Sequence, residues 1–288
     1  MRRPPSFLLP AIIVYFIFFV IPNVLEFVLA FTNWSTYHSG IAFDGLSNFQ
    51  SLISQGSPSL SQSIVVTIEY AVIVVVVENV VGLLLALALE RPTIIHQAIR
   101  VLVFFPVFLA PLATGYAFKG VLQPNGPINA ALSLLLDHKV TTAWLSSFSF
   151  SIVAVGLIGA WKFVGFNMTI FLAGLSGITP EISGAAKVDG ATSFRLFRHI
   201  KLPMLAPALT ISVVLGFVGS LSAFDIVMGS TGGGPGTATV VLNVYVWLSY
   251  VAGSLGQGTA VSMSLFVLIA VTAIPVIFLM RRRERVLR

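Results

Sequence analysis

The sequence predicts an all-α integral membrane protein with six transmembrane helices. Of its 288 residues, 57% are hydrophobic and only 9% are charged, and the mean hydropathy of +0.98 is too apolar for a soluble domain of this length. The apolar residues form several runs of about 20 residues, long enough for a helix to cross the hydrocarbon core of a bilayer. These runs are continuous rather than alternating, which favours helices over a β-barrel.

The first expected span, residues 7–31, follows Arg2 and Arg3. A basic start of this kind resembles a cleaved secretion leader. However, the apolar run is longer than the core of such a leader, which has about 7 to 15 residues, and it has no A-x-A-like cleavage site. We therefore expect this segment to remain as a membrane anchor.

Five further apolar runs follow, and all six are expected to form one membrane domain over residues 1–288. A short polar segment separates the second run from the third. The turn signal at 123–127 follows the third run, and the glycine-rich segment 231–236 follows the fifth. The expected spans are residues 7–31, 64–89, 101–118, 150–171, 206–227 and 260–280.

The distribution of lysine and arginine predicts that both termini lie in the cytoplasm. With this orientation, 13 of the 16 basic residues flank the cytoplasmic ends of the spans, as the positive-inside rule requires. The same asymmetry accounts for the net charge of +6 without any nucleic-acid partner. The inner basic residues are Arg2, Arg3, Arg91, Arg100, Lys187, Arg195, Arg198, Lys201, Arg281, Arg282, Arg283, Arg285 and Arg288.

The long inner loop, residues 174–205, is expected to contain two short helices. Pro180 suits the first turn of a helix, and Gly190 suits its left-handed end. Thr192 is a candidate N-cap of the second helix, and Pro203 is expected to end that helix. From these features alone, the loop is either a docking surface for a partner or a connector lying on the membrane.

Polar side chains inside the expected spans are candidates for a substrate path, because burying a polar or charged group in hydrocarbon is unfavourable. Glu69 and Glu78 are nine residues apart, about 2.5 helical turns, so they are expected on opposite faces and not as a catalytic carboxylate pair. Each is a candidate partner for Lys162 or for a substrate. The polar residues in or at the ends of the spans include Glu69, Glu78, Asn79, Lys162, Asn167 and Asp225.

Several classes of chemistry are not supported by the composition. The chain has no cysteine, and its four histidines lie outside or at the edges of the spans without metal-ligand spacing. It contains no G-x-x-x-x-G-K-[ST] phosphate loop, so it is not expected to bind or hydrolyse ATP itself. We expect neither a catalytic site nor a metal site in this chain.

The segment EISGAAKVDGA at 181–191, continued by IKLP at 200–203, resembles the EAA loop of permease subunits in bacterial ATP-binding cassette importers. Further matches are WKFVGFN at 161–167 and FD at 224–225 followed by TGGGP at 231–235. Together they resemble the carbohydrate-importer branch, close to the maltose and glycerol-phosphate permeases. One position departs from the pattern, because Gly184 stands where the motif has its glutamate.

The resemblance implies a permease subunit of an ATP-driven carbohydrate importer in the bacterial cytoplasmic membrane. It implies a second homologous permease, two ATPase subunits that bind ATP and Mg²⁺, and an extracytoplasmic sugar-binding protein. ATP binding would close the ATPase dimer, and the loop helix would transmit this movement to the path. The coupling residues on the matching positions are Glu181, Gly184, Ala185, Ala186, Asp189 and Gly190.

The resemblance also directs attention to the fourth to sixth spans, where related permeases hold the sugar. Trp161 offers a flat apolar face for a sugar ring, although a tryptophan in a span also serves as a packing residue or interface anchor. With Glu69 from the second span, the candidate path residues are Glu69, Trp161, Lys162, Asn167, Ser220 and Asp225.

Two other functions are compatible with a polytopic chain. A self-sufficient secondary transporter or channel would use Glu69, Glu78 and Lys162 as an ion relay. An intramembrane enzyme would need a shared catalytic site, which the scattered histidines do not provide. The long and specific inner loop favours the ATP-driven importer over both. The identity of the sugar or polyol does not follow from the sequence.

Overall fold

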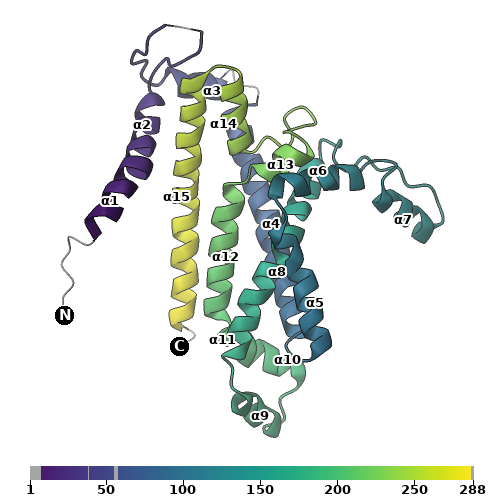
Figure 1. Ribbon diagram of the computed structural model, residues 1–288. Helices are drawn as coiled ribbons and strands as arrows, with labels where there is room; N and C mark the ends of the chain where they lie inside the picture. The colour runs from purple at the N-terminus through teal and green to yellow at the C-terminus, as the bar shows by residue number, and fades with distance from the viewer. Residues whose placement is uncertain (1–7, 38, 55–57, 287–288) are drawn as a thin grey trace.

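The computed structural model describes residues 8–37, 39–54 and 58–286, and within these ranges the regular elements are all helices. Figure 1 shows the longest of them side by side in an elongated bundle. The elements are α1 (Leu9–Tyr15), η2 (Phe16–Val20), α2 (Ile21–Leu29), α3 (Ser47–Ser54), α4 (Leu60–Ala88), α5 (Ile94–Phe104), η3 (Phe105–Phe108), α6 (Pro111–Val121), α7 (Pro127–Leu136), α8 (Ser151–Ser176), α9 (Pro180–Val188), α10 (Ser193–Leu196), η4 (Phe197–Lys201), α11 (Leu202–Met204), α12 (Ala206–Leu221), α13 (Asp225–Ser230), α14 (Leu242–Val251) and α15 (Leu255–Val286).

The described residues offer four to six membrane spans. Four helical runs are long and apolar enough to cross a bilayer: Leu9–Leu29, Leu60–Ala88, Ser151–Ser176 and Leu255–Arg282. Two bent helix pairs bring the number to six if each pair crosses as one span. Phe7, where the first span is expected to begin, lies outside the described residues, as do Arg2, Arg3 and Arg288.

The third expected span, 101–118, is broken in its middle. The run Ile94–Phe108 and α6 meet at 102°, with only two residues between them. Pro106 and Pro111 supply no backbone N–H, and Ala110 before Pro111 is extended (φ −60°, ψ 130°), as residues before proline prefer. The apolar composition does not indicate this break, because the segments on both sides of it are apolar.

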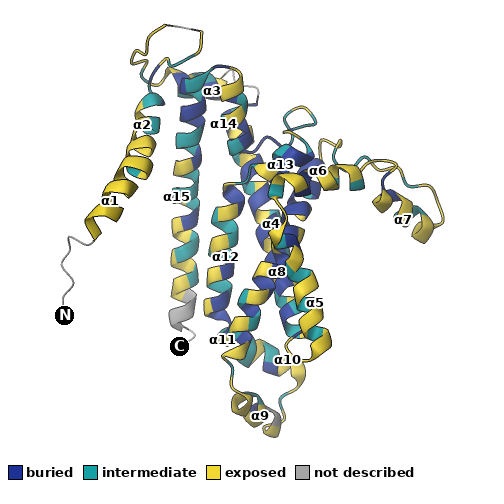
Figure 2. Cartoon of the chain, in the orientation of Figure 1, coloured by how far each residue is buried: buried dark blue, intermediate teal, exposed yellow. Residues whose placement is uncertain are grey.

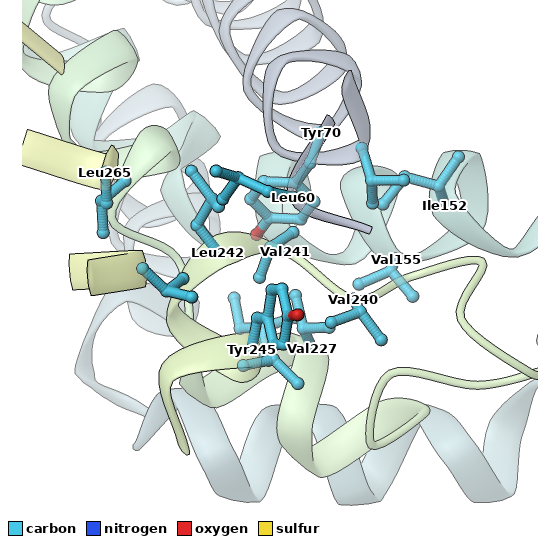
Figure 3. Close-up of a cluster of buried hydrophobic side chains, with 14 of the residues drawn as sticks. Leu60, Tyr70, Ile152, Val155, Val227, Val240, Val241, Leu242, Tyr245 and Leu265 are labelled. Atoms are coloured by element: carbon cyan, nitrogen blue, oxygen red, sulfur yellow. The ribbon is translucent and has the colours of Figure 1, made fainter. Parts of the chain in front are cut away.

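The core lies where α4 packs against α8. A Cβ atom added to Gly156 of α8 would lie 2.7 Å from Cγ2 of Ile73, and one added to Gly159 would lie 2.5 Å from the hydroxyl of Tyr70. Small residues at these points let the two helices approach closely. Figure 3 shows the adjoining buried cluster, which includes Leu60, Tyr70, Val155, Val227, Val241, Leu242 and Tyr245.

The segment between the fifth and sixth expected spans is more ordered than a connecting loop. The expected fifth span, 206–227, ends as a helix at Leu221, and the chain then forms the short helices α13 and α14. Val241 and Leu242 at the start of α14 are fully buried, and the backbone N–H of Leu242 donates to Thr67 Oγ1 of α4 at 2.9 Å. These contacts fasten α14 to the core.

The first helical run stands apart from the rest of the bundle. Figure 2 shows α1 and most of α2 in the colour of exposed residues, although most of their side chains are apolar. Phe27 of α2 meets Phe266 of α15 edge to face, with ring centroids 5.2 Å apart. Such a surface is suited to lipid or to another membrane subunit.

The inner loop follows the sequence prediction through the start of its second helix. The first helix, α9, begins at Pro180, and Gly190 beyond its end adopts a φ of +78°, in the left-handed region. Thr192 is the N-cap of α10, because its Oγ1 accepts a hydrogen bond from the backbone N–H of Arg195 at 3.4 Å. Two short helices joined by a glycine turn were therefore predictable.

The prediction that Pro203 ends the second helix was wrong. The helical chain continues through Pro203 to Met204, and the bend of 65° lies between this run and α12. The π turn η4, which ends at Lys201 two residues before Pro203, already departs from the α-helical hydrogen-bond pattern with which a proline interferes. Proline is therefore accommodated within the helix, and the inner loop leads directly into α12.

Candidate functional site

A cavity of about 380 Å³ lies between α4, α8, α12 and α13. Its wall combines hydrogen-bonding groups with flat apolar surfaces, which suits a small polar molecule that has apolar faces of its own. The polar side chains of the wall are Glu78, Asn167, Ser220, Ser222 and Asp225, and the aromatic ones are Tyr70, Phe163, Phe166 and Phe224.

Three of the six candidate path residues line this cavity, and they come from three helices. Asn167 belongs to α8, Ser220 to the last turns of α12, and Asp225 to the first turn of α13. Asn167 is buried, and its Oδ1 accepts a hydrogen bond from Ser212 Oγ of α12. Residues far apart in the sequence are thus brought to one site by the packing of α8 against α12.

Glu69 and Glu78 lie on opposite faces of α4, which confirms the prediction from their spacing. Glu78 is 1% exposed and faces the cavity, whereas Glu69 is exposed and lines a separate, more open hollow of about 650 Å³. In that hollow, Gln62 Nε2 donates to Thr237 Oγ1 at 2.9 Å. The candidate path residue Glu69 and the cavity residue Glu78 therefore belong to different sites.

Lys162 is directed at the broken span between α5 and α6. It is 2% exposed, and its Nζ donates to the backbone carbonyl oxygens of Pro106 (3.1 Å), Val107 (3.0 Å) and Leu109 (2.5 Å). A helix end leaves carbonyl groups without donors, and an ammonium group has three N–H bonds to offer them. In this position Lys162 holds the bend in place.

The alternative that Glu69 or Glu78 pairs with Lys162, which the sequence left open beside contact with a substrate, does not hold. The Lys162 ammonium group donates its hydrogen bonds to three backbone carbonyl groups instead. The ion pair found among the described residues joins Lys201 to Glu90 at 2.5 Å. Trp161, the neighbour of Lys162, packs edge to face against Phe118, with ring centroids 5.0 Å apart. It borders an apolar hollow beside α4 and α5 rather than the polar cavity.

The helix α9 projects from the end of the bundle opposite α7 and α14 (Figure 1). Glu181, Ala185 and Asp189 are exposed on it, and the apolar side chain of Val188 is 88% exposed. A Cβ atom added to Gly184 would find no atom within 4 Å. Ala186 is the buried member of the predicted coupling set. Most of this predicted surface is therefore open to another protein.

Basic residues gather at the same end of the bundle as α9. In Figure 1 that end also holds the start of α5, the run from α10 to α11 and the C-terminal end of α15. The basic residues in or next to these segments whose side chains are described are Arg91, Arg100, Arg195, Arg198, Lys201, Arg281 and Arg282.

The sequence analysis named Glu78 as a polar span residue but chose Glu69 rather than Glu78 for the path, and it missed the aromatic wall of the cavity. Helical periodicity separates Glu69 from Glu78 but does not say which one faces the interior. Nothing in the sequence distinguishes the three phenylalanines of the wall from the other phenylalanines of the chain, which has 23 in all. A polar Glu78 beside Asn79 in an otherwise apolar run was the available signal for Glu78.

Residues 78–287 match the model of the family described as "Binding-protein-dependent transport system inner membrane component". The chain is 28% identical over 280 residues to a probable starch degradation products transport system permease protein of Thermoanaerobacterium thermosulfurigenes, covering 96% of this chain and 94% of that one. It is 29% identical over 263 residues to the trehalose/maltose transport system permease protein of Thermococcus litoralis, covering 91% and 88%.

The fold also resembles a solved one. A chain of a bacterial ABC transporter involved in the import of the acidic polysaccharide alginate aligns with a TM-score of 0.77 and 21% sequence identity. The alignment covers 97% of this chain and 94% of the other. A second structure of a bacterial alginate ABC transporter, in complex with a periplasmic protein that holds an alginate pentasaccharide, aligns with a TM-score of 0.78.

Proposed function

Because this chain belongs to the family of binding-protein-dependent transport system inner membrane components, we propose that it is the permease subunit of an ATP-driven carbohydrate importer. It forms half of the translocation path and couples to a separate ATPase subunit. The observation that carries this proposal is the family match over 78–287, which includes α9 and the residues Glu78, Asn167, Ser220, Ser222 and Asp225 of the cavity wall. The chain is a transport subunit and not itself the ATPase.

The cavity supports a carbohydrate as the transported molecule. Sugars present hydroxyl groups at their edges and apolar C–H faces, and the wall offers carboxyl, amide and hydroxyl groups beside aromatic rings. The names of several relatives point the same way, since they describe transport of starch degradation products, of trehalose and maltose, and of multiple sugars.

We propose three kinds of protein partner. The exposed apolar run α1–α2 is suited to contact with a second, homologous permease subunit, and α9 is suited to docking on one of two ATPase subunits that hold ATP and Mg²⁺. An extracytoplasmic sugar-binding protein delivers the substrate at the opposite end. Of one structural neighbour, the alginate transporter, a complex with its periplasmic protein is known.

Short helices joined by a glycine turn and a bend connect α9 to the cavity. The run α10–η4–α11 leads from the inner loop into α12, whose residues Gly216 and Ser220 line the cavity. Lys201 of this run pairs with Glu90 beyond the end of α4, another wall of the cavity. Movement of α9 with the ATPase would therefore reach α4 and α12 together, which is how we propose that ATP binding changes the side to which the path opens.

Labelling of single cysteines tests the proposed orientation, with both termini and α9 in the cytoplasm. The chain has no native cysteine, so Lys139→Cys beyond α7 and Val188→Cys at the end of α9 each give a chain with a single thiol. Both positions are exposed. In sealed cells, an impermeant maleimide should label the Lys139→Cys variant, but it should label the Val188→Cys variant only after lysis. Labelling of position 188 in sealed cells would contradict the proposed orientation, because it would place α9 outside the cell.

Purification of the complex tests the proposed subunit arrangement. The tagged chain, coexpressed with the permease, ATPase and binding-protein genes beside it, should purify with the second permease and the ATPase in stoichiometric amounts. Sugar-loaded binding protein should stimulate ATP hydrolysis by this complex. Omission of this chain should remove the stimulation, and ATP hydrolysis that responds to sugar equally well without it would contradict the proposal.

A further inference from the structure

Glu78 is a buried carboxyl group whose hydrogen-bonding capacity is incompletely used. The residue is 1% exposed, and its Oε1 has no hydrogen-bond partner among the described residues. Its neighbour Asn79 does not donate a hydrogen bond to it, because Asn79 Nδ2 donates to the carbonyl oxygen of Val75. A buried polar atom without a partner is unfavourable and uncommon in folded proteins. Because Glu78 also lines the cavity, a ligand there would lie beside this carboxyl group.

The packing of α4 against α12 holds this carboxyl group in place. Gly216 of α12 provides the necessary space, because a Cβ atom there would collide with Glu78 Oε1. Asn167 of α8 lies close to the same carboxyl group. Ser220 follows Gly216 by one helical turn on α12 and lines the same cavity. The Glu78 carboxyl group therefore belongs to the cavity and not to the lipid-facing side of α4.

Within the part of the chain that the structure describes, the wall of the cavity contains acidic side chains but no basic ones. Glu78 and Asp225 both line it, whereas no lysine, arginine or histidine of the described residues does. Lys162 precedes the wall residue Phe163, but its Nζ is occupied by the carbonyl oxygens of Pro106, Val107 and Leu109. A molecule that carries a carboxylate, sulfate or phosphate group would meet like charge there without a compensating cation.

We propose that Glu78 is a specificity-determining residue of the translocation path, and that the path accepts uncharged sugars and rejects anionic ones. A sugar hydroxyl forms a hydrogen bond with the Glu78 carboxyl group while the ring lies against the aromatic wall. The proposal deepens the proposed function and rests on it, because it names the charge class of the sugar that the path carries. The chain is thereby distinguished from a transporter of acidic sugars, although one such transporter shares its fold.

A thiol reporter in the cavity tests the charge part without any sugar. Ala223→Cys places a single thiol in the wall, and the partner subunits are made cysteine-free. The assembled complex in nanodiscs is treated with a cationic and an anionic methanethiosulfonate reagent, and the rate at which each reagent modifies the thiol is measured. The ratio of the cationic to the anionic rate is then divided by the same ratio for a free thiol in solution. The normalised ratio should favour the cation and should fall about fivefold or more when Glu78→Gln is added.

Asp225→Asn in the same reporter background is a second variant and should also lower the ratio, since it removes the other carboxylate of the wall. An exposed carboxylate provides the matched control: Asp44→Asn, on the segment between α2 and α3, should leave the ratio unchanged. Equal ratios with and without the Glu78→Gln substitution would overturn the proposed rejection of anions.

Transport in proteoliposomes tests the hydrogen bond to the sugar, with maltose, trehalose and lactose as neutral probes and an alginate oligosaccharide as the anionic probe. The wild-type complex should carry a neutral probe and not the anionic one. Glu78→Gln should raise the KM for the neutral probe about tenfold with little change in kcat, because it replaces the carboxyl group by an amide but keeps the side-chain shape. An unchanged KM in an assembled Glu78→Gln complex would overturn the role of Glu78.

The two tests separate this proposal from the proposed function. If the wild-type complex moved no sugar at all, the carbohydrate-importer function would fail, while the reagent ratio would still report the charge selectivity of the cavity. Transport of the alginate oligosaccharide in preference to the neutral probes would leave the importer function intact and overturn the charge class proposed here.

Discussion

Replacement of Lys162 by methionine should prevent assembly of a stable complex rather than merely slow transport. The Lys162 ammonium satisfies the carbonyl oxygens of Pro106, Val107 and Leu109 at a bend that is otherwise short of donors. Methionine fills similar space but donates nothing, so buried carbonyl groups lose their partner at a cost of about 1–3 kcal/mol each. We expect little complex on gel filtration in detergent and a lowered melting temperature for whatever assembles.

A lysine on the surface of the adjoining helix serves as the control. Lys119 of α6 is exposed, and Lys119→Met removes the same charge without uncovering buried carbonyl groups. This variant should assemble and melt like the wild type. If Lys162→Met instead assembled normally and lost uptake, Lys162 would act on the substrate, as the sequence analysis expected, and its contacts with the bend would be secondary.

Gly184→Trp should abolish coupling to the ATPase while leaving the membrane part intact. A Cβ atom at Gly184 meets nothing within 4 Å of this chain, so the indole strains no contact inside the chain. A partner docked closely on α9 would be displaced by a side chain of that size. We expect normal expression and normal thermal stability of the chain, loss of the ATPase subunit on affinity purification, and no transport.

The matched control is another glycine with open space around it. Gly120, near the end of α6, also has nothing within 4 Å of an added Cβ atom, but it lies far from α9 on the other end of the bundle (Figure 1). Gly120→Trp should retain the ATPase subunit. If Gly184→Trp also retained it, with sugar-stimulated ATP hydrolysis at the wild-type level, α9 would not be the coupling surface.

Hydropathy predicted where apolar helices occur but not where they bend. The helices of the structure cover most of each of the six spans that the apolar runs predicted. The bends of 102° and 65° depend on prolines and local backbone conformation, which average hydropathy does not register. Helix capping chemistry was more informative in the inner loop, where Pro180, Gly190 and Thr192 each have a local role that their residue type specifies.

The candidate site was partly predictable because polar residues in apolar spans are few. Asn167 and Asp225 could be chosen on that ground, and both line the cavity. The choice between Glu69 and Glu78 required knowledge of which face of α4 packs against α8 and α12. The contacts of Lys162 required knowledge of the broken span, because its acceptors are backbone carbonyl groups and not the side chains that a sequence displays.

Uptake into proteoliposomes tests the central claim most directly, namely that this chain forms a sugar path driven by a separate ATPase. The purified complex is reconstituted with ATP inside the vesicles, and labelled neutral sugar is added outside together with the binding protein. We predict uptake that requires both ATP and the binding protein, that stops when the phosphate-loop lysine of the ATPase subunit is replaced, and that ignores imposed proton and sodium gradients. Uptake by this chain alone, driven by an ion gradient without ATP, would contradict the account.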